Sequence, residues 1–283
     1  MEILKMRIYL LLFPFLFAQD NTQQVEINIS TTVDFAYAGK IFLNTTQYAS
    51  KGLYKEEVES KYEKFYVRMF AGGNKIVGKI LSQEDQSLLM YSKSEKKFSE
   101  EMFQDIKKNN GVPTLKDVTK MNPRGERGND NSSGTTSTTN QAESDRDISR
   151  LISNNSYDIN GFNCQKITTK ISDENGSVLI EEWISNDTSL FIFVNNELSS
   201  LTASYGGTHT KSGDSSSWIK AIDPNKKITT IPGEIIKSSI VWKNDEGKNT
   251  FSMTREVLSA VFSDFNSSEF EISKNFKKVS QLN

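Results

Sequence analysis

The chain has 283 residues, and its 34 Lys and Arg residues nearly balance 36 Asp and Glu residues, which gives a formal net charge of -2. This balance and an isoelectric point of about 5.7 exclude the strongly basic surface that is typical of nucleic-acid-binding proteins. One cysteine excludes an intramolecular disulfide, and one histidine leaves too few nitrogen and sulfur ligands for an ordinary zinc site.

The amino-terminal segment has the three-part pattern of a secretory signal peptide. Lys5 and Arg7 precede the apolar run 8–17, and Ala18 is followed by polar residues. The run is shorter than the roughly twenty apolar residues that a bilayer-spanning helix needs. We therefore predict a signal peptide at residues 1–18, cleavage near Ala18, and an exported protein, periplasmic or secreted, that is soluble and not integral to the membrane.

The mature chain, residues 19–283, is expected to form a single exported domain, and its first part has the pattern of antiparallel strands. Residues 25–50 are rich in β-branched and aromatic side chains and predict one or two strands. Apolar residues alternate through 65–70, and a glycine pair predicts a turn before the returning strand 75–81. Another strand is predicted at 87–92, which completes an antiparallel meander.

A short helix is predicted at residues 99–108. Ser99 suits the N-cap position, two glutamates follow it, and two lysines stand near the end, where they favour the helix dipole. Beyond this helix, residues 121–142 contain almost no apolar side chain, so they cannot repay the entropy of ordering. They predict a disordered polar insertion.

Two hairpins are expected in the second half of the chain. Strands at 157–172 and 177–185 are joined by residues 173–176, which end in the turn-favouring pair Asn-Gly. Strands at 235–243 and 248–257 form the second hairpin.

The segment between the hairpins, 188–205, begins with a strand-like run. It continues with helical spacing at Leu198, Leu201 and Tyr205, so we predict a helix there. A last packed element is expected at 261–272, where apolar and aromatic residues recur.

Few residues carry the chemistry of an active site. His209 lies in a segment that is predicted to be an exposed loop. It is the one histidine of the chain, so a histidine-dependent hydrolase would need it as the general base. Glu181 and Glu182 are adjacent on a predicted strand, so they point to opposite faces and cannot share a glycosidase cleft. Cys164 is expected to be a buried structural thiol. We predict no catalytic residue, no metal ligand and no cofactor, and hence a protein that is not an enzyme.

Four parts of the chain resemble an exported bacterial family, the domain of unknown function 4412. They are FAYAGKI at 35–41, LLMYSK at 88–93, GFNCQK at 161–166 followed by Glu182-Trp183, and IPGEII at 231–236. The resemblance covers roughly residues 31–275. It implies a LolA-like fold, similar to the periplasmic lipoprotein carriers, with a strongly curved antiparallel sheet, or half-barrel, and an apolar cavity. The expected fold class is α+β and mostly β, with one or two short helices packed on the sheet.

Bulky side chains of such a half-barrel can either line a ligand cavity or fill the core. The cavity candidates are Phe65, Phe70, Met90, Met102, Phe103, Trp183 and Trp242. With a cavity, the chain would be a non-enzymatic binder of an apolar or lipidic ligand in the cell envelope. The alternative is a protein-interaction or envelope-assembly module whose concavity is filled by its own helix and whose sheet edges bind partners. No nucleic-acid partner is expected.

Overall fold

The computed structural model describes residues 23–120, 147–209 and 231–282. The strands are β1 Gln23–Phe35, β2 Gly39–Ser50, β3 Leu53–Tyr62, β4 Lys75–Ser82, β5 Ser87–Ser92, β6 Lys97–Met102, β7 Asp147–Ile159, β8 Phe162–Asp173, β9 Gly176–Ser185, β10 Glu234–Asn244, β11 Asn249–Asp264 and β12 Lys277–Lys278. The helices are α1 Phe65–Phe70, α2 Phe103–Lys108, α3 Ser189–Ser204 and the short 3-10 helix η1 Ser267–Phe270.

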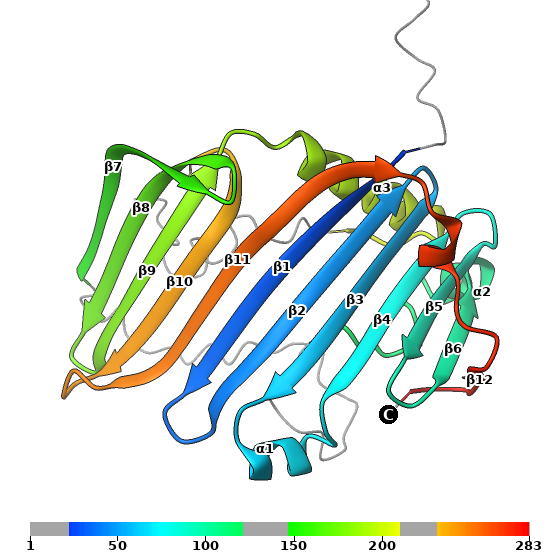
Figure 1. Ribbon diagram of the computed structural model, residues 1–283, viewed down its shortest axis with the longest axis horizontal. Helices are drawn as coiled ribbons and strands as arrows, with labels where there is room; N and C mark the ends of the chain where they lie inside the picture. The colour runs from blue at the N-terminus through cyan, green and yellow to red at the C-terminus, as the bar shows by residue number, and fades with distance from the viewer. Residues whose placement is uncertain (1–22, 121–146, 210–230, 283) are drawn as a thin grey trace, which may run out of the picture.

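Within the described residues, all twelve strands form one sheet in the order β12-β6-β5-β4-β3-β2-β1-β11-β10-β9-β8-β7. Neighbouring strands are antiparallel except β12 and β6, which are parallel. The sheet is open and curved, and the helices are few and short (Figure 1). The expected fold class is therefore confirmed. The predicted signal peptide at 1–18 and the polar insertion at 121–142 lie outside the described residues.

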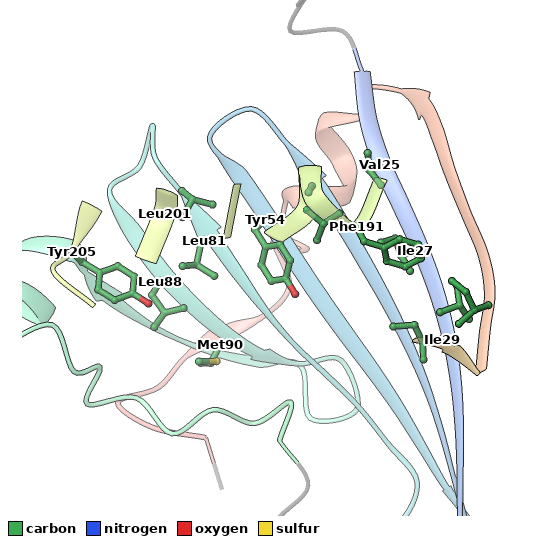
Figure 2. Packing of buried hydrophobic residues seen from close by; sticks show 14 of the residues in the cluster. Val25, Ile27, Ile29, Tyr54, Leu81, Leu88, Met90, Phe191, Leu201 and Tyr205 are labelled. Carbon is green, nitrogen blue, oxygen red and sulfur yellow. The ribbon is translucent and has the colours of Figure 1, made fainter. Parts of the chain in front are cut away.

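One face of the sheet is covered by α3, which lies behind the strands in Figure 1. Strand β1, at the centre of the sheet, buries alternate residues, including Val25 and Ile27. Helix α3 buries Phe191, Val194 and Leu201, whose spacing of three and seven places them on one helix face. Figure 2 shows Phe191 and Leu201 directed at the strands. The helix predicted at 188–205 is confirmed.

The strand predicted at 65–70 is wrong, because these residues form α1. The last residue pair between β3 and β4 is Ser60 with Lys75, so the segment between them has no neighbouring strand to pair with. Its amides bond locally instead, as in the 3.0 Å bond from the Arg68 amide to the Lys64 carbonyl. No residue of α1 is buried. The alternating apolar residues at 65–70 therefore form neither a strand nor a part of the core.

The helix predicted at 99–108 begins later than expected. Residues 97–102 form β6, and α2 starts at Phe103 with no side-chain cap. The acidic residues do not serve a helix dipole: Glu100 pairs with Lys278 at 2.6 Å, and Glu101 accepts hydrogen bonds from the amides of residues 114 and 115. The pairing of this segment with β5 overrides its local helix signal.

The predicted hairpins are confirmed as β8 with β9 and as β10 with β11. The strand expected at 157–172 is interrupted, because Asn160 and Gly161 take positive φ angles of 54° and 86° and turn β7 into β8. The element expected at 261–272 is also divided: its first residues continue β11, and Phe270 belongs to η1.

Cys164 is buried as expected, with 1% of its surface exposed, and burial followed by the charge of Asp158 raises the pKa of its thiol to about 11. Because the thiolate is the reactive form, we expect Cys164 to react with a disulfide reagent at pH 8 at least about a hundredfold more slowly than in guanidinium-unfolded protein. Absorbance of the released thiolate measures both rates. Equal rates would contradict the buried placement.

Candidate functional site

A groove of about 630 Å³ lies on the face of the sheet that carries α3. Leu81, Leu88 and Met90 form its floor on β4 and β5, and Leu198 of α3 and Leu115 form apolar walls. Figure 2 shows the three floor residues on neighbouring strands, with Leu201 above Leu81 and Tyr205 beside Leu88. The volume falls within the range of small-molecule sites in proteins.

Strand register explains why these residues meet. Leu81 is directly opposite Leu88, and Met90 is opposite Lys79, so alternate residues of both strands share the groove face. Tyr54 is opposite Leu81 on the other side, which extends the same face onto β3.

A charged cluster occupies the groove beside this apolar floor. The Lys79 ammonium lies 3.1 Å from a carboxylate oxygen of Glu56 and 3.1 Å from one of Asp117. Tyr54 donates a 2.9 Å hydrogen bond to Glu56, and Thr119 donates through its amide and hydroxyl to Asp117. The Lys79 side chain is only 14% exposed, so its charge depends on these two carboxylates.

The pKa values of the cluster follow from this arrangement. Burial opposes the charge of Lys79, but Glu56 and Asp117 outweigh it and raise the pKa of the ammonium. Burial likewise opposes the charge of Asp117, but Lys79 and the bonds from Thr119 lower the pKa of its carboxyl. Burial, followed by the neighbouring Glu56, raises the pKa of the Tyr54 phenol. All three groups keep their usual charge states at neutral pH.

His209 also lines the groove, and it lies in a loop as expected but is half-buried and not exposed. Its ring nitrogen Nε2 lies 3.4 Å from the amide oxygen of Asn195 on α3, and the contact is partly buried. Burial, followed by the charge of Lys79, lowers the pKa of the imidazole, which favours the neutral form. The sequence of the loop does not predict this position, because the burial of His209 depends on α3, which precedes the loop.

The structure separates the seven cavity candidates. Met90 lines the groove. Phe103 is buried in the core, with its ring centroid 5.2 Å from that of Tyr205. The other five lie away from the groove: Phe65 and Phe70 on α1, Met102 at the end of β6, Trp183 under the ammonium groups of Lys166 and Lys237, and Trp242, half exposed, near the end of β10.

Sequence reasoning missed most of the groove. The strands predicted at 75–81 and 87–92 place Leu81 and Leu88 in the sheet, but their apolar residues are consecutive and do not show which face each lines. The cluster of Glu56, Lys79 and Asp117 had no signal in the sequence, because the three residues lie on separate segments of ordinary charged sequence.

A second groove, of about 560 Å³, lies on the opposite face, between β3, β5 and the carboxyl-terminal residues 268–276. Lys55 and Tyr91, which alternate with the groove-facing Tyr54 and Met90, form its base. Two of the four lysines that line it form ion pairs: Lys55 with Glu269 at 3.2 Å and Lys93 with Glu57 at 2.7 Å. The α3-side groove has the larger set of strand-borne apolar residues and is the better candidate.

The described residues contain no group of three or more His, Cys, Asp and Glu side chains placed to hold a metal ion. Glu181 and Glu182 do point apart: Glu181 pairs with Lys166 at 2.6 Å, while Glu182 is buried near Arg150. None of the helices in the described segments has the length and hydropathy to span a bilayer.

Among known proteins, the chain is similar only to solved structures. No family model matches the chain, so membership of the domain of unknown function 4412 family stays a prediction, and no curated protein matches either. Among solved structures, the chain is similar to a LolA superfamily protein from Nitrosomonas europaea, with 7% identity, a TM-score of 0.26, and coverage of 88% of this chain and 90% of the other. The fold class stated above rests on the sheet and helices themselves.

Proposed function

We propose that the protein is a non-enzymatic binding protein that holds an amphipathic, lipid-like ligand in the α3-side groove. The observation that carries this proposal is the apolar floor of Leu81, Leu88 and Met90 facing Leu198 across a volume of about 630 Å³. Leu81, Leu88 and Met90 are each only 2–3% exposed, so the apolar chain of the ligand contributes most of the surface that binding removes from water.

The charged cluster narrows the ligand class. A wholly apolar ligand would have to desolvate Lys79 and its carboxylates, which costs free energy, whereas a ligand with a polar end can leave them hydrogen-bonded. The apolar chain therefore lies along the leucine floor, and the polar end lies toward Lys79, Asp117 and His209, all of which line the same groove.

Export belongs to the same proposal. The signal-peptide pattern of residues 1–18 directs the chain out of the cytoplasm, and a lipid-like ligand of the cell envelope is then available to it. Site of action and ligand class are thus consistent.

A second candidate function is an interaction module whose concave face is self-filled. The specific observation in its favour is that α3 buries Phe191, Val194 and Leu201 against the sheet and so occupies much of the apolar surface. In that case partners bind elsewhere, and the groove holds only water.

A matched pair of tryptophan variants tests the groove. Leu198→Trp places a larger side chain into the groove, while Ile192→Trp places the same side chain on the exposed side of α3, where Ile192 is 47% exposed. We expect L198W to weaken binding of a fluorescent fatty acid about tenfold or more and I192W to change it less than about twofold. Fluorescence titration of delipidated protein measures both affinities.

Native mass spectrometry of protein extracted gently from its producing cells measures independently whether a lipid is bound. A mass increment that matches one lipid, absent from L198W, supports the proposal. Protein that is always empty, does not bind the fatty acid and co-purifies with one envelope protein would favour the self-filled module.

A further inference from the structure

The helix α1 and the neighbouring β1–β2 turn expose a group of large apolar side chains at one end of the strands β1 to β4. Phe70 is 84% exposed, Phe65 69% and Met69 60%, and Tyr37 in the turn is 90% exposed. Tyr66 is 46% exposed, and its hydroxyl donates a 2.8 Å hydrogen bond to the Tyr37 carbonyl, which joins the turn to the helix. These five residues are called the α1 tip. A group of this kind marks an interaction surface, unlike a single exposed apolar residue.

The α1 tip has no role in the core of the fold. No residue of α1 is buried, whereas α2 and α3 each bury residues against the sheet. In Figure 1, α1 projects beyond the lower ends of β3 and β4, away from α3 at the upper ends of the strands. The structure therefore places aromatic side chains where they contribute little to folding and can reach another surface.

Basic side chains accompany these aromatic residues. The Arg68 guanidinium lies 5.4 Å from the centroid of the Phe65 ring, and the Lys64 ammonium lies 5.8 Å from that of Tyr66. Lys64 also donates to the Tyr37 carbonyl at 2.9 Å. Neither cation forms an ion pair with a carboxylate of the described residues. Glu63, which precedes Lys64, adds one negative charge, so the two cations leave the tip with a small positive charge, although the whole chain has a net charge of -2.

We infer that the α1 tip docks on an anionic lipid surface. Aromatic and methionine side chains enter the boundary between headgroups and acyl chains, while Lys64 and Arg68 remain beside the lipid phosphates. The complementary charges favour a lipid surface over a neutral apolar partner such as a second copy of this chain. The inference goes beyond the ligand groove and does not depend on it, because the groove residues lie elsewhere on the sheet.

Vesicle flotation tests this inference. The full mature chain is mixed with vesicles of equal parts phosphatidylglycerol and phosphatidylcholine, or of phosphatidylcholine alone. We expect the wild type to bind the anionic vesicles more strongly, and less so at high salt. The double variant Phe65→Ser with Phe70→Ser should lose about tenfold in binding, and Arg68→Gln should reduce the preference for anionic vesicles. Leu151→Ser is the matched control, since Leu151 is 71% exposed on β7.

Depth of insertion gives a second measurement. A tryptophan at position 70, introduced as Phe70→Trp, should be quenched by brominated lipids, and Leu151→Trp should not. Equal vesicle binding by the wild type and the double variant would overturn the inference. So would a wild type that does not bind vesicles but self-associates, if the double variant no longer self-associates. Because no residue of α1 is buried, the double variant and Arg68→Gln should unfold at the wild-type temperature. They should also keep the wild-type affinity for fatty acid, which separates this test from that of the groove.

Discussion

Replacement of Phe103 by alanine is expected to lower the free energy of unfolding by about 3–5 kcal/mol, because the substitution leaves a cavity between α2 and α3. Phe103 is 2% exposed and belongs to the same buried cluster as Ile106 and Leu201. Its ring packs against Tyr205 at the end of α3, so the loss also loosens the contact between the two helices. Urea unfolding followed by circular dichroism measures the change.

Phe70→Ala is the matched control for this prediction. The side chain removed is the same, but Phe70 is 84% exposed, so we expect a change within about 0.5 kcal/mol. A comparable loss in both variants would show that α1 contributes to the core after all. An unchanged stability in F103A would instead place Phe103 in a ligand cavity that tolerates truncation.

This pair also shows what sequence can decide. The sequence does not distinguish Phe70 from Phe103, and both were candidates either to line a ligand cavity or to fill the core. Their positions differ because β3 and β4 stop pairing before residue 65, whereas Phe103 follows a strand that pairs to its end. Those pairings are long-range contacts, and no local pattern in a single sequence records them.

The elements in which residue spacing and turn residues indicate the same structure were predictable. The β8–β9 and β10–β11 hairpins combine alternation with turn residues, and α3 has helical spacing over sixteen residues. The class of fold followed from these elements. By contrast, the groove combines β3, β4, β5, α3 and the segment around Asp117, and their meeting depends on how the sheet curves.

The charge pattern was the least informative part of the sequence. Glu100 and Glu101 follow a serine and resemble the start of a helix, yet Glu101 accepts hydrogen bonds from the loop at 114–115 and Glu100 pairs with Lys278. Glu56 and Lys79 look like solvated residues in sequence but are mostly buried side by side. A charged residue becomes informative only when its partner is known.

Replacement of Lys79 by methionine is expected to destabilise the fold by about 3 kcal/mol at pH 7, because it leaves Glu56 and Asp117 as neighbouring, mostly buried carboxylates without their cation. Lys108→Met is the matched control. Its partner Asp105 is on the surface, and the two side chains are 74% and 53% exposed, so the loss should stay below about 0.5 kcal/mol. Thermal or urea unfolding compares the two.

The difference in stability between wild type and K79M should depend on pH in a defined way. The folded-state pKa of Asp117 is lowered, so its contribution is present above the unfolded value of about 3.9 and is lost as pH falls through the folded value. The folded-state pKa of Lys79 is raised, so its contribution is present below about 10.4 and is lost as pH rises through the folded value. The difference should therefore be largest between these limits and shrink in acid, where protonation removes the carboxylate charges.

Neutralising the two carboxylates separates lost charge pairing from lost packing. Adding Glu56→Gln and Asp117→Asn to K79M removes the unpaired charges while the shape of the groove wall stays similar, so most of the lost stability should return. A triple variant as unstable as K79M would mean that the lysine stem, packed beside Met90, provides the stability. In that case the cluster would be a packing feature of the groove, and its charges would be free to serve the polar end of the ligand.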